Sequence, residues 1–224
     1  MNPPDTPRIT RIRARNSRSP RIIVDIDGEF WAELDGEVVL KNGLARDQLL
    51  PPQRQQELLA EDAFIRGRRA AAILLNTRPR SEYELRNKLR EKEFDPATID
   101  RVIEYFRESG KVDDAEFARI YARSQLKNRK QGPGKVAAKL RRLGVGEKEI
   151  SLALQDQPAT DEDEQRRRAE DLAEKRLARM RSEDDPAKVR RKLTGALMRA
   201  GFDPSITREV LDAAMDRWMR EQAE

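Results

Sequence analysis

Three stretches of this chain repeat one pattern of apolar residues, and this repetition restricts the possible folds more than any other feature. In each stretch a leucine precedes an apolar residue by five positions, and two apolar residues follow eight and nine positions after that residue. The leucines are Leu89, Leu140 and Leu197, and the residues five positions later are Phe94, Val145 and Phe202. Because a period of about 50 residues is the length of three short helices, it predicts tandem helical units that cannot bury their apolar faces alone.

Helix start signals recur along the region that follows Pro51 and Pro52. Ser or Asp caps a helix N-terminus, with Glu three positions later or Pro at the first helical position. These pairs are Ser81 with Glu84, Asp95 with Pro96, Asp113 with Glu116, Asp185 with Pro186, and Asp203 with Pro204. Together with the repeat, they predict three-helix units at residues 53–110, 111–157 and 158–224. Aromatic residues at equivalent or core-facing positions are expected in the cores: Tyr83, Phe94, Phe106, Phe117 and Phe202.

The first 50 residues lack this helical period. Residues 1–20 contain four prolines and five arginines with only two large aliphatic residues, and we expect them to form a disordered basic arm. Residues 21–50 alternate apolar and polar side chains up to Asp27-Gly28 and again up to Asp35-Gly36, and Asp-Gly between such runs is a strong hairpin signal. We therefore predict a small antiparallel sheet of three strands, the last at Glu37–Lys41, packed on another part of the chain.

The composition favours a mostly α-helical, elongated array over one thick domain. Hydrophobic residues make up 37% and charged residues 39% of the 224 residues, against norms of about 45–50% and about 25%. The chain contains no cysteine and no histidine, which excludes disulfides, Cys/His zinc sites and histidine-dependent catalysis. No apolar run approaches the length of about 20 residues that spans a bilayer. We expect a cytoplasmic protein without a cofactor or metal.

The positive charge is concentrated in two segments. The net charge of the chain is +5, yet residues 123–142 hold eight cations and no acid, and residues 1–20 hold five arginines and one acid. On a helix that starts near Gly134, Lys135, Lys139 and Arg142 share a face about a quarter turn from the apolar stripe. This face is either a solvated helix surface or a binding surface for an anionic partner. Because residues 123–142 contain no aromatic residue for base stacking, they suit phosphates or protein carboxylates rather than bases.

Other candidate sites have simpler structural explanations. Asp113-Asp114 resembles a metal-binding pair, but its position before a helix favours capping. Gly132-Pro-Gly-Lys135 lacks the full spacing of a phosphate loop and favours a helix start, although a free helix N-terminus could hold a phosphate. Arg78 and Arg80 precede a helix, where they form either a surface loop or a contact point. Paired carboxylates alone could hold magnesium, but caps and helix faces account for the acids of this chain.

Three segments together resemble the RecX family of regulators of the RecA recombinase. They are Leu75–Leu85, Gly110–Ala118, and Gly132–Val136 continuing through Leu140 to Gly144-Val145. Their order and spacing over residues 70–155 carry the resemblance. Residues 156–224 match only as a divergent third unit, and the β segment and the arginine arm lie outside the common core of the family.

The resemblance implies a non-enzymatic negative modulator built of tandem three-helix units in an elongated, curved array. Such a protein binds in the groove of the RecA–single-stranded DNA filament and suppresses its ATPase, strand-exchange and coprotease activities. It would contact single-stranded DNA weakly or through the filament, and we expect a monomer. An autonomous basic DNA-binding protein is the alternative, because three-helix units can place a helix in a duplex groove. The residues expected to contact the partner or DNA are Arg78, Arg80, Arg123, Lys127, Arg129, Lys130, Lys135, Lys139 and Arg142.

Overall fold

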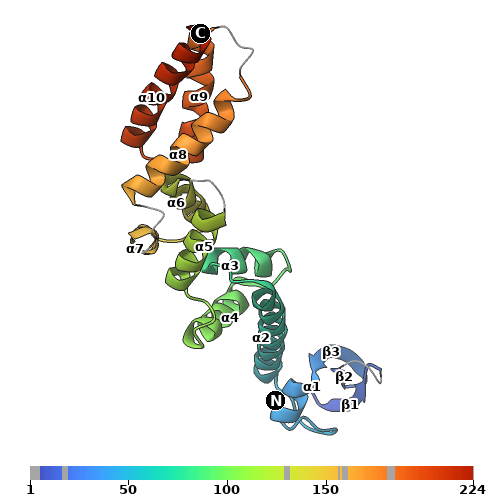
Figure 1. Cartoon of the computed structure of the whole chain (residues 1–224). Coiled ribbons are helices and arrows are strands. Elements are labelled where there is room, and N and C mark those ends of the chain that lie inside the picture. The colour runs from blue at the N-terminus through green and yellow to red at the C-terminus, as the bar shows by residue number, and fades with distance from the viewer. Residues whose placement is uncertain are drawn as a thin grey trace. The chain divides into compact units, whose positions relative to one another are not determined.

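The computed structural model describes residues 6–16, 20–128, 132–155, 157, 161–180 and 185–223. These residues form three β-strands and ten α-helices, so the chain is mostly helical as predicted (Figure 1). They group into two compact units. The first contains the chain up to Pro79 and Leu85–Lys111, and the second contains Arg80–Glu84 and the chain from Val112 onward.

A three-stranded antiparallel sheet begins the first unit. It consists of β1 (Ile9–Ala14), β2 (Arg21–Ile26) and β3 (Glu29–Asp35) in the order β1-β2-β3. Asp27 and Gly28, with φ of 51° and 89°, form the predicted turn between β2 and β3. The prediction that residues 1–20 are a disordered arm is wrong for β1, while residues 1–5 and 17–19 lie outside the described residues. β1 is ordered because its few aliphatic residues complete the sheet core, where Ile9 is fully buried and Ile12 packs alongside it.

The strand predicted at Glu37–Lys41 is instead the short helix α1 (Gly36–Lys41). Asp35 acts as its N-cap by accepting a hydrogen bond from the Glu37 amide at 3.0 Å, so Asp35-Gly36 starts a helix and not a hairpin. The alternation expected for β3 also fails at one end. An irregularity in the β2–β3 pairing next to Asp25 leaves Phe30 66% exposed, while Ala32 and Leu34 remain buried.

A partly buried ion network fastens the sheet to α2 (Pro52–Thr77), as expected for a sheet too small to be stable alone. Asp62 of α2 accepts a hydrogen bond from the backbone amide of Asp35 at 2.7 Å and forms an ion pair with Arg21 at 2.5 Å. Arg69 of α2 pairs with Asp35. Burial raises the pKa of Asp35. The hydrogen bond from the Glu37 amide and the Arg69 guanidinium together lower it by more, so the pKa of Asp35 lies below its ordinary value.

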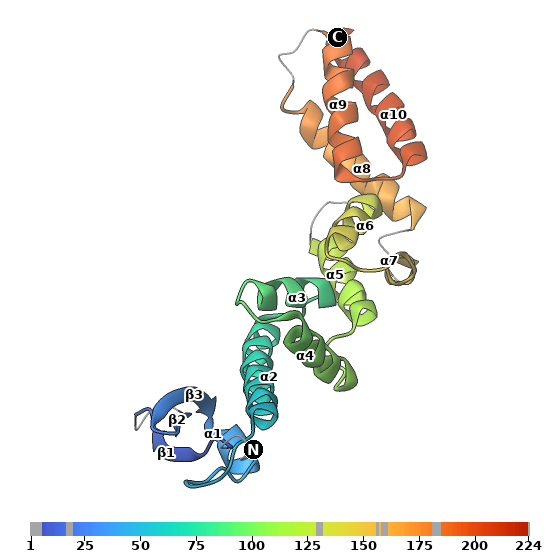
Figure 2. The same ribbon diagram turned by 180° about the vertical axis from the view of Figure 1, so that it is seen from behind.

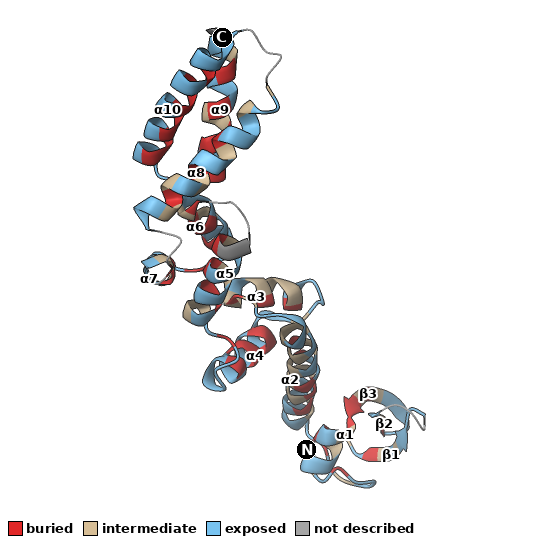
Figure 3. Cartoon of the chain, viewed as in Figure 1, coloured by how far each residue is buried: buried red, intermediate tan, exposed pale blue. Residues whose placement is uncertain are grey.

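The helical part consists of successive groups of three helices, which confirms the predicted fold class. In the first unit α2 packs on α4 (Pro96–Glu108), and Val102, Ile103 and Phe106 of α4 are buried. The helix α3 (Glu82–Arg90) lies between them in sequence and buries Leu85 and Leu89. Of the aromatic residues predicted as core, Phe106 is buried and Phe94 is half-buried, but Tyr83 is 51% exposed. Buried and exposed stripes alternate along these helices in Figure 3.

The second unit contains two further groups of three helices (Figure 2). The first group is α5 (Asp114–Asn128), α6 (Pro133–Arg142) and α7 (Glu147–Gln155), with a core that includes Phe117, Leu126 and Leu140. The second group is α8 (Glu162–Leu177), α9 (Pro186–Ala200) and α10 (Pro204–Ala223). Its core includes Leu193, Leu197, Phe202 and Trp218. Each group thus has its own cluster of buried residues, as the repeat predicts.

Candidate functional site

A face of α6 carries three exposed cations that form no ion pair with a described residue. Lys135, Lys139 and Arg142 are exposed, whereas Val136 and Leu140 between them are 1% and 0% exposed and belong to the core. Within the described residues, none of the three cationic side chains forms an ion pair. Many other arginines of the chain form ion pairs with acidic side chains. The three cations of α6 form none with a described residue, so they are available to an anionic ligand. We call Lys135, Lys139 and Arg142 the α6 basic face.

The remaining cations of the segment differ in their surroundings. Arg123 lies on α5, which packs against α6, and it is exposed without an ion pair to a described residue. Arg141 forms a two-point ion pair with Glu147, with one N–O distance of 2.9 Å, and this pairing raises the pKa of Arg141. Its charge is therefore compensated internally. Arg129, Lys130 and the side chain of Lys127 lie outside the described residues.

The N-terminus of α6 is occupied by the end of α9. The Gly132 amide donates to the Ala200 carbonyl at 2.8 Å, and the Gly134 amide donates to the Gly201 carbonyl at 3.0 Å. Pro133 has no amide hydrogen. These bonds place the N-terminal end of one helix dipole against the C-terminal end of another. The glycine-rich start is a helix start, as expected, and these two amides are not available to a phosphate.

A second junction joins the start of α3 to the end of α6. The Ser81 hydroxyl accepts a hydrogen bond from the Glu84 amide at 3.2 Å, which confirms it as the cap of α3, and donates to the Leu143 carbonyl at 2.6 Å. The bond to Leu143 places the residue after Arg80 next to the residue after Arg142. Arg80 is half-buried, and Arg78 is exposed and donates to the Pro79 carbonyl at 2.9 Å.

The Asp113-Asp114 pair caps two different helices. The Asp113 carboxylate accepts hydrogen bonds from the amides of Ala115 and Glu116 at 2.9 and 3.0 Å, at the start of α5. The Asp114 carboxylate instead accepts from the Glu82 amide at 2.8 Å, at the start of α3. Burial, helped by the charges of Glu82, Asp113 and Glu149, raises the pKa of Asp114 despite that hydrogen bond. In the described part of the chain, no group of three or more acids is placed to hold a metal ion.

Sequence reasoning found the α6 basic face but missed the two junctions. A cap on the same helix is visible from spacing, whereas the partners Ala200, Gly201 and Leu143 lie more than 60 residues away from the groups they meet. The only local signal was glycine at equivalent turn positions, Gly144 and Gly201, both with positive φ. None of the described helices combines the length and apolar character needed to cross a bilayer.

Comparison with known proteins agrees with the repeated architecture. The family models for the first, second and third three-helix domains of RecX match residues 68–106, 113–154 and 162–211, respectively. Two similar proteins, both named regulatory protein RecX, come from Clostridium acetobutylicum and a Mycobacterium species. The first is 30% identical over 91% of this chain and 94% of its own length, and the second is 37% identical over 62% of this chain and 75% of its own.

The fold is also shared with a crystal structure of a regulatory protein RecX, which has a TM-score of 0.71 and 23% identity and covers 92% of this chain and 99% of that one. These matches extend into the N-terminal β segment, whereas the family models begin at residue 68 within α2. The expectation that the β segment lies outside the common core therefore applies to the family models and not to these relatives. With matches over all three helical domains and nearly the full length of the Clostridium relative, the chain belongs to the RecX family of regulatory proteins.

Proposed function

We propose that this protein is a negative regulator of the RecA recombinase that acts by binding and not as an enzyme. It binds in the groove of the RecA–single-stranded DNA filament and lowers the ATPase, strand-exchange and coprotease activities of RecA. Membership of a regulatory family supports the role. The observation that carries the binding mode is the α6 basic face, a row of exposed cations without ion pairs to described residues.

The chemistry of the α6 basic face suits a nucleoprotein filament. Lysine and arginine side chains bind phosphate oxygens and carboxylates, and both groups are present where protein covers a DNA strand. Inhibition then follows from differential affinity, because a modulator shifts a filament only as far as it binds one state more tightly than another.

The first experiment is a titration of this protein into RecA hydrolysing ATP on single-stranded DNA. A parallel measurement of binding to the same DNA without RecA, at the same salt concentration, separates filament binding from DNA coating. Inhibition well below one molecule per RecA subunit, with weak binding to bare DNA, supports a filament modulator. No inhibition, or inhibition only when the protein coats the DNA, contradicts the proposal.

Reversing the charge of the α6 basic face should weaken inhibition. We expect Lys135→Glu, Lys139→Glu and Arg142→Glu together to raise the concentration for half-inhibition at least about tenfold at about 0.1 M salt, because three phosphate or carboxylate contacts become repulsive. The matched control reverses three exposed cations outside α6: Lys92 and Lys111, which follow α3 and α4, and Arg167 of α8. None of them forms an ion pair with a described residue. Normal inhibition by a triple variant with an unchanged thermal unfolding curve would remove the α6 basic face from the mechanism.

An autonomous DNA-binding protein is the second candidate, favoured by the same exposed cations and by the three-helix units. Tight, sequence-selective binding to duplex DNA in the absence of RecA would support it. Weak binding that falls steeply with salt would not, because any basic surface gives that behaviour.

A further inference from the structure

The third group of helices contains a groove between α8 and α10 that differs in chemistry from the α6 basic face. Its cavity volume is about 310 Å³. The floor is apolar and includes Ala173 and Leu177 of α8 and Val210 and Ala213 of α10. Small side chains on both helices leave space that larger ones would fill. The groove therefore offers an apolar surface to a side chain from outside.

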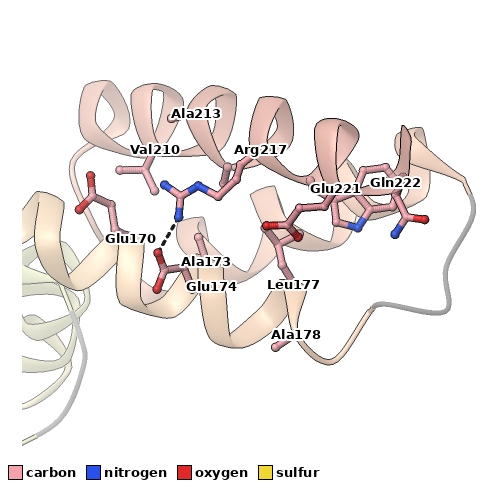
Figure 4. A pocket seen from close by; sticks show the side chains of 12 residues that line it. Glu170, Ala173, Glu174, Leu177, Ala178, Val210, Ala213, Arg217, Glu221 and Gln222 are labelled. Carbon is pink, nitrogen blue, oxygen red and sulfur yellow. Dashed lines mark hydrogen bonds and ion pairs between the residues drawn. The ribbon is translucent and has the colours of Figure 1, made fainter. Parts of the chain in front are cut away.

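Carboxylates flank this floor (Figure 4). Glu174 is neutralised by Arg217, whose guanidinium lies 2.7 Å from it. Glu170 and Glu221 line the groove on either side of that pair, and neither forms an ion pair with a described residue. The groove thus carries two uncompensated negative charges within a chain of net charge +5. Phosphate is repelled here, and a cationic ligand is attracted.

Trp218 lies beside the groove and carries a buried donor. The residue lines the groove and is 4% exposed, yet its indole N–H has no hydrogen-bond acceptor among the described residues. A buried donor without an acceptor is uncommon and destabilises the protein that contains it. Because the nitrogen is itself buried, a ligand in the groove does not reach it, and recognition rests on the apolar floor and on Glu170 and Glu221.

We propose that the α8–α10 groove binds a cationic segment of a protein partner. The segment places an apolar side chain on the floor between two lysine or arginine side chains that meet Glu170 and Glu221. A protonated polyamine would match the charges but has no apolar branch for the floor. This inference rests on the proposed function, since it takes the partner to be the protein part of the RecA filament.

The test compares binding to a RecA–single-stranded DNA filament, held with a slowly hydrolysed ATP analogue, by co-sedimentation of the full-length chain. Glu170→Gln with Glu221→Gln keeps the shape of the groove and removes its charge. We expect binding to weaken about fivefold to tenfold, because two charge-assisted contacts are lost. The matched control, Glu162→Gln with Asp216→Asn, makes the same charge change on exposed acids of the same two helices outside the groove. It should bind like the wild type. Binding to bare single-stranded DNA should stay unchanged in both variants, because neither changes the α6 basic face.

Each contrary outcome has one meaning. If the wild type binds the filament and the groove variant binds equally well, the groove proposal fails and the proposed function stands. Equal weakening in the control variant also overturns the groove proposal. If the wild type does not bind the filament, the proposed function and the groove proposal fail together.

Discussion

Asp114 shows how one side chain connects two parts of the repeat. It stands beside Asp113, the ordinary cap of α5, but its carboxylate accepts from the Glu82 amide and so caps α3. Burial and three neighbouring acids raise its pKa. A carboxyl whose pKa is higher in the folded than in the unfolded protein stabilises the fold below the unfolded pKa and loses that contribution as the pH rises through the folded pKa.

Asp114→Asn should therefore keep the cap and remove the pH dependence. The amide oxygen can still accept from Glu82, and the side chain never ionises. We expect the variant to be as stable as the wild type or more so at neutral pH, with the difference growing from about pH 4 to about pH 7. Asp114→Ala, which lacks the acceptor, should lose about 1 kcal/mol. Denaturant unfolding over this pH range measures both effects, and equal losses in the two variants would show that the negative charge itself is needed.

At the scale of elements, a glycine after the second helix of a three-helix group allows the preceding group to approach closely. Gly144 and Gly201 have φ of 80° and 81°, and a Cβ at either position would overlap Tyr83 or Lys135, respectively. The equivalent residue of the first group is Glu93, with φ of 63° and an exposed side chain. Positive φ is thus common to all three turns. Glycine is found at the two turns where another three-helix group makes contact.

Gly201→Ala tests that second requirement. Gly110 is the matched control, because its φ is 67° and nothing lies within 4 Å of a Cβ built there. Gly110→Ala should cost only the strain of a left-handed residue, about 1 kcal/mol. Gly201→Ala should cost a further 1–3 kcal/mol, about the usual penalty of overpacking, because its Cβ would push into the α6 backbone. The free energies of unfolding from denaturant titrations decide the matter, and equal losses in both variants would contradict a packing role for Gly201.

The elements differ in how far local sequence could predict them. Helices with Asp-Pro or Ser-x-x-Glu starts were predicted correctly because the cap and the apolar stripe lie in the same short segment. β1 was missed because its low apolar content suggested disorder, although burial of Ile9 anchors it to the sheet. The helix α1 was missed because an alternating five-residue run fits a strand as well. The α6 basic face follows from helical spacing, but the α8–α10 groove requires two helices to meet.

At the scale of the whole molecule, stability is divided among separate clusters of buried residues. One lies under the sheet, one among α5–α7 and one among α8–α10. Repeat proteins with such local cores unfold by units whose stabilities need not be equal, so a single unfolding transition is not expected. The chain contains two tryptophans, and they lie in different clusters: Trp31 packs against the sheet core and Trp218 belongs to the α8–α10 core.

Single-tryptophan variants can therefore report on two clusters within one protein. In Trp218→Phe the remaining indole reports on the sheet core, and in Trp31→Phe it reports on the α8–α10 core. Each phenylalanine preserves an aromatic ring, so the overall helix content followed by circular dichroism should match the wild type. We expect the fluorescence midpoints in urea to differ by about 0.5 M or more, with circular dichroism spanning both. Coincident transitions in all three signals would mean instead that the chain unfolds cooperatively. Contacts between three-helix groups, such as the backbone hydrogen bonds from Gly132 and Gly134, would then couple their unfolding.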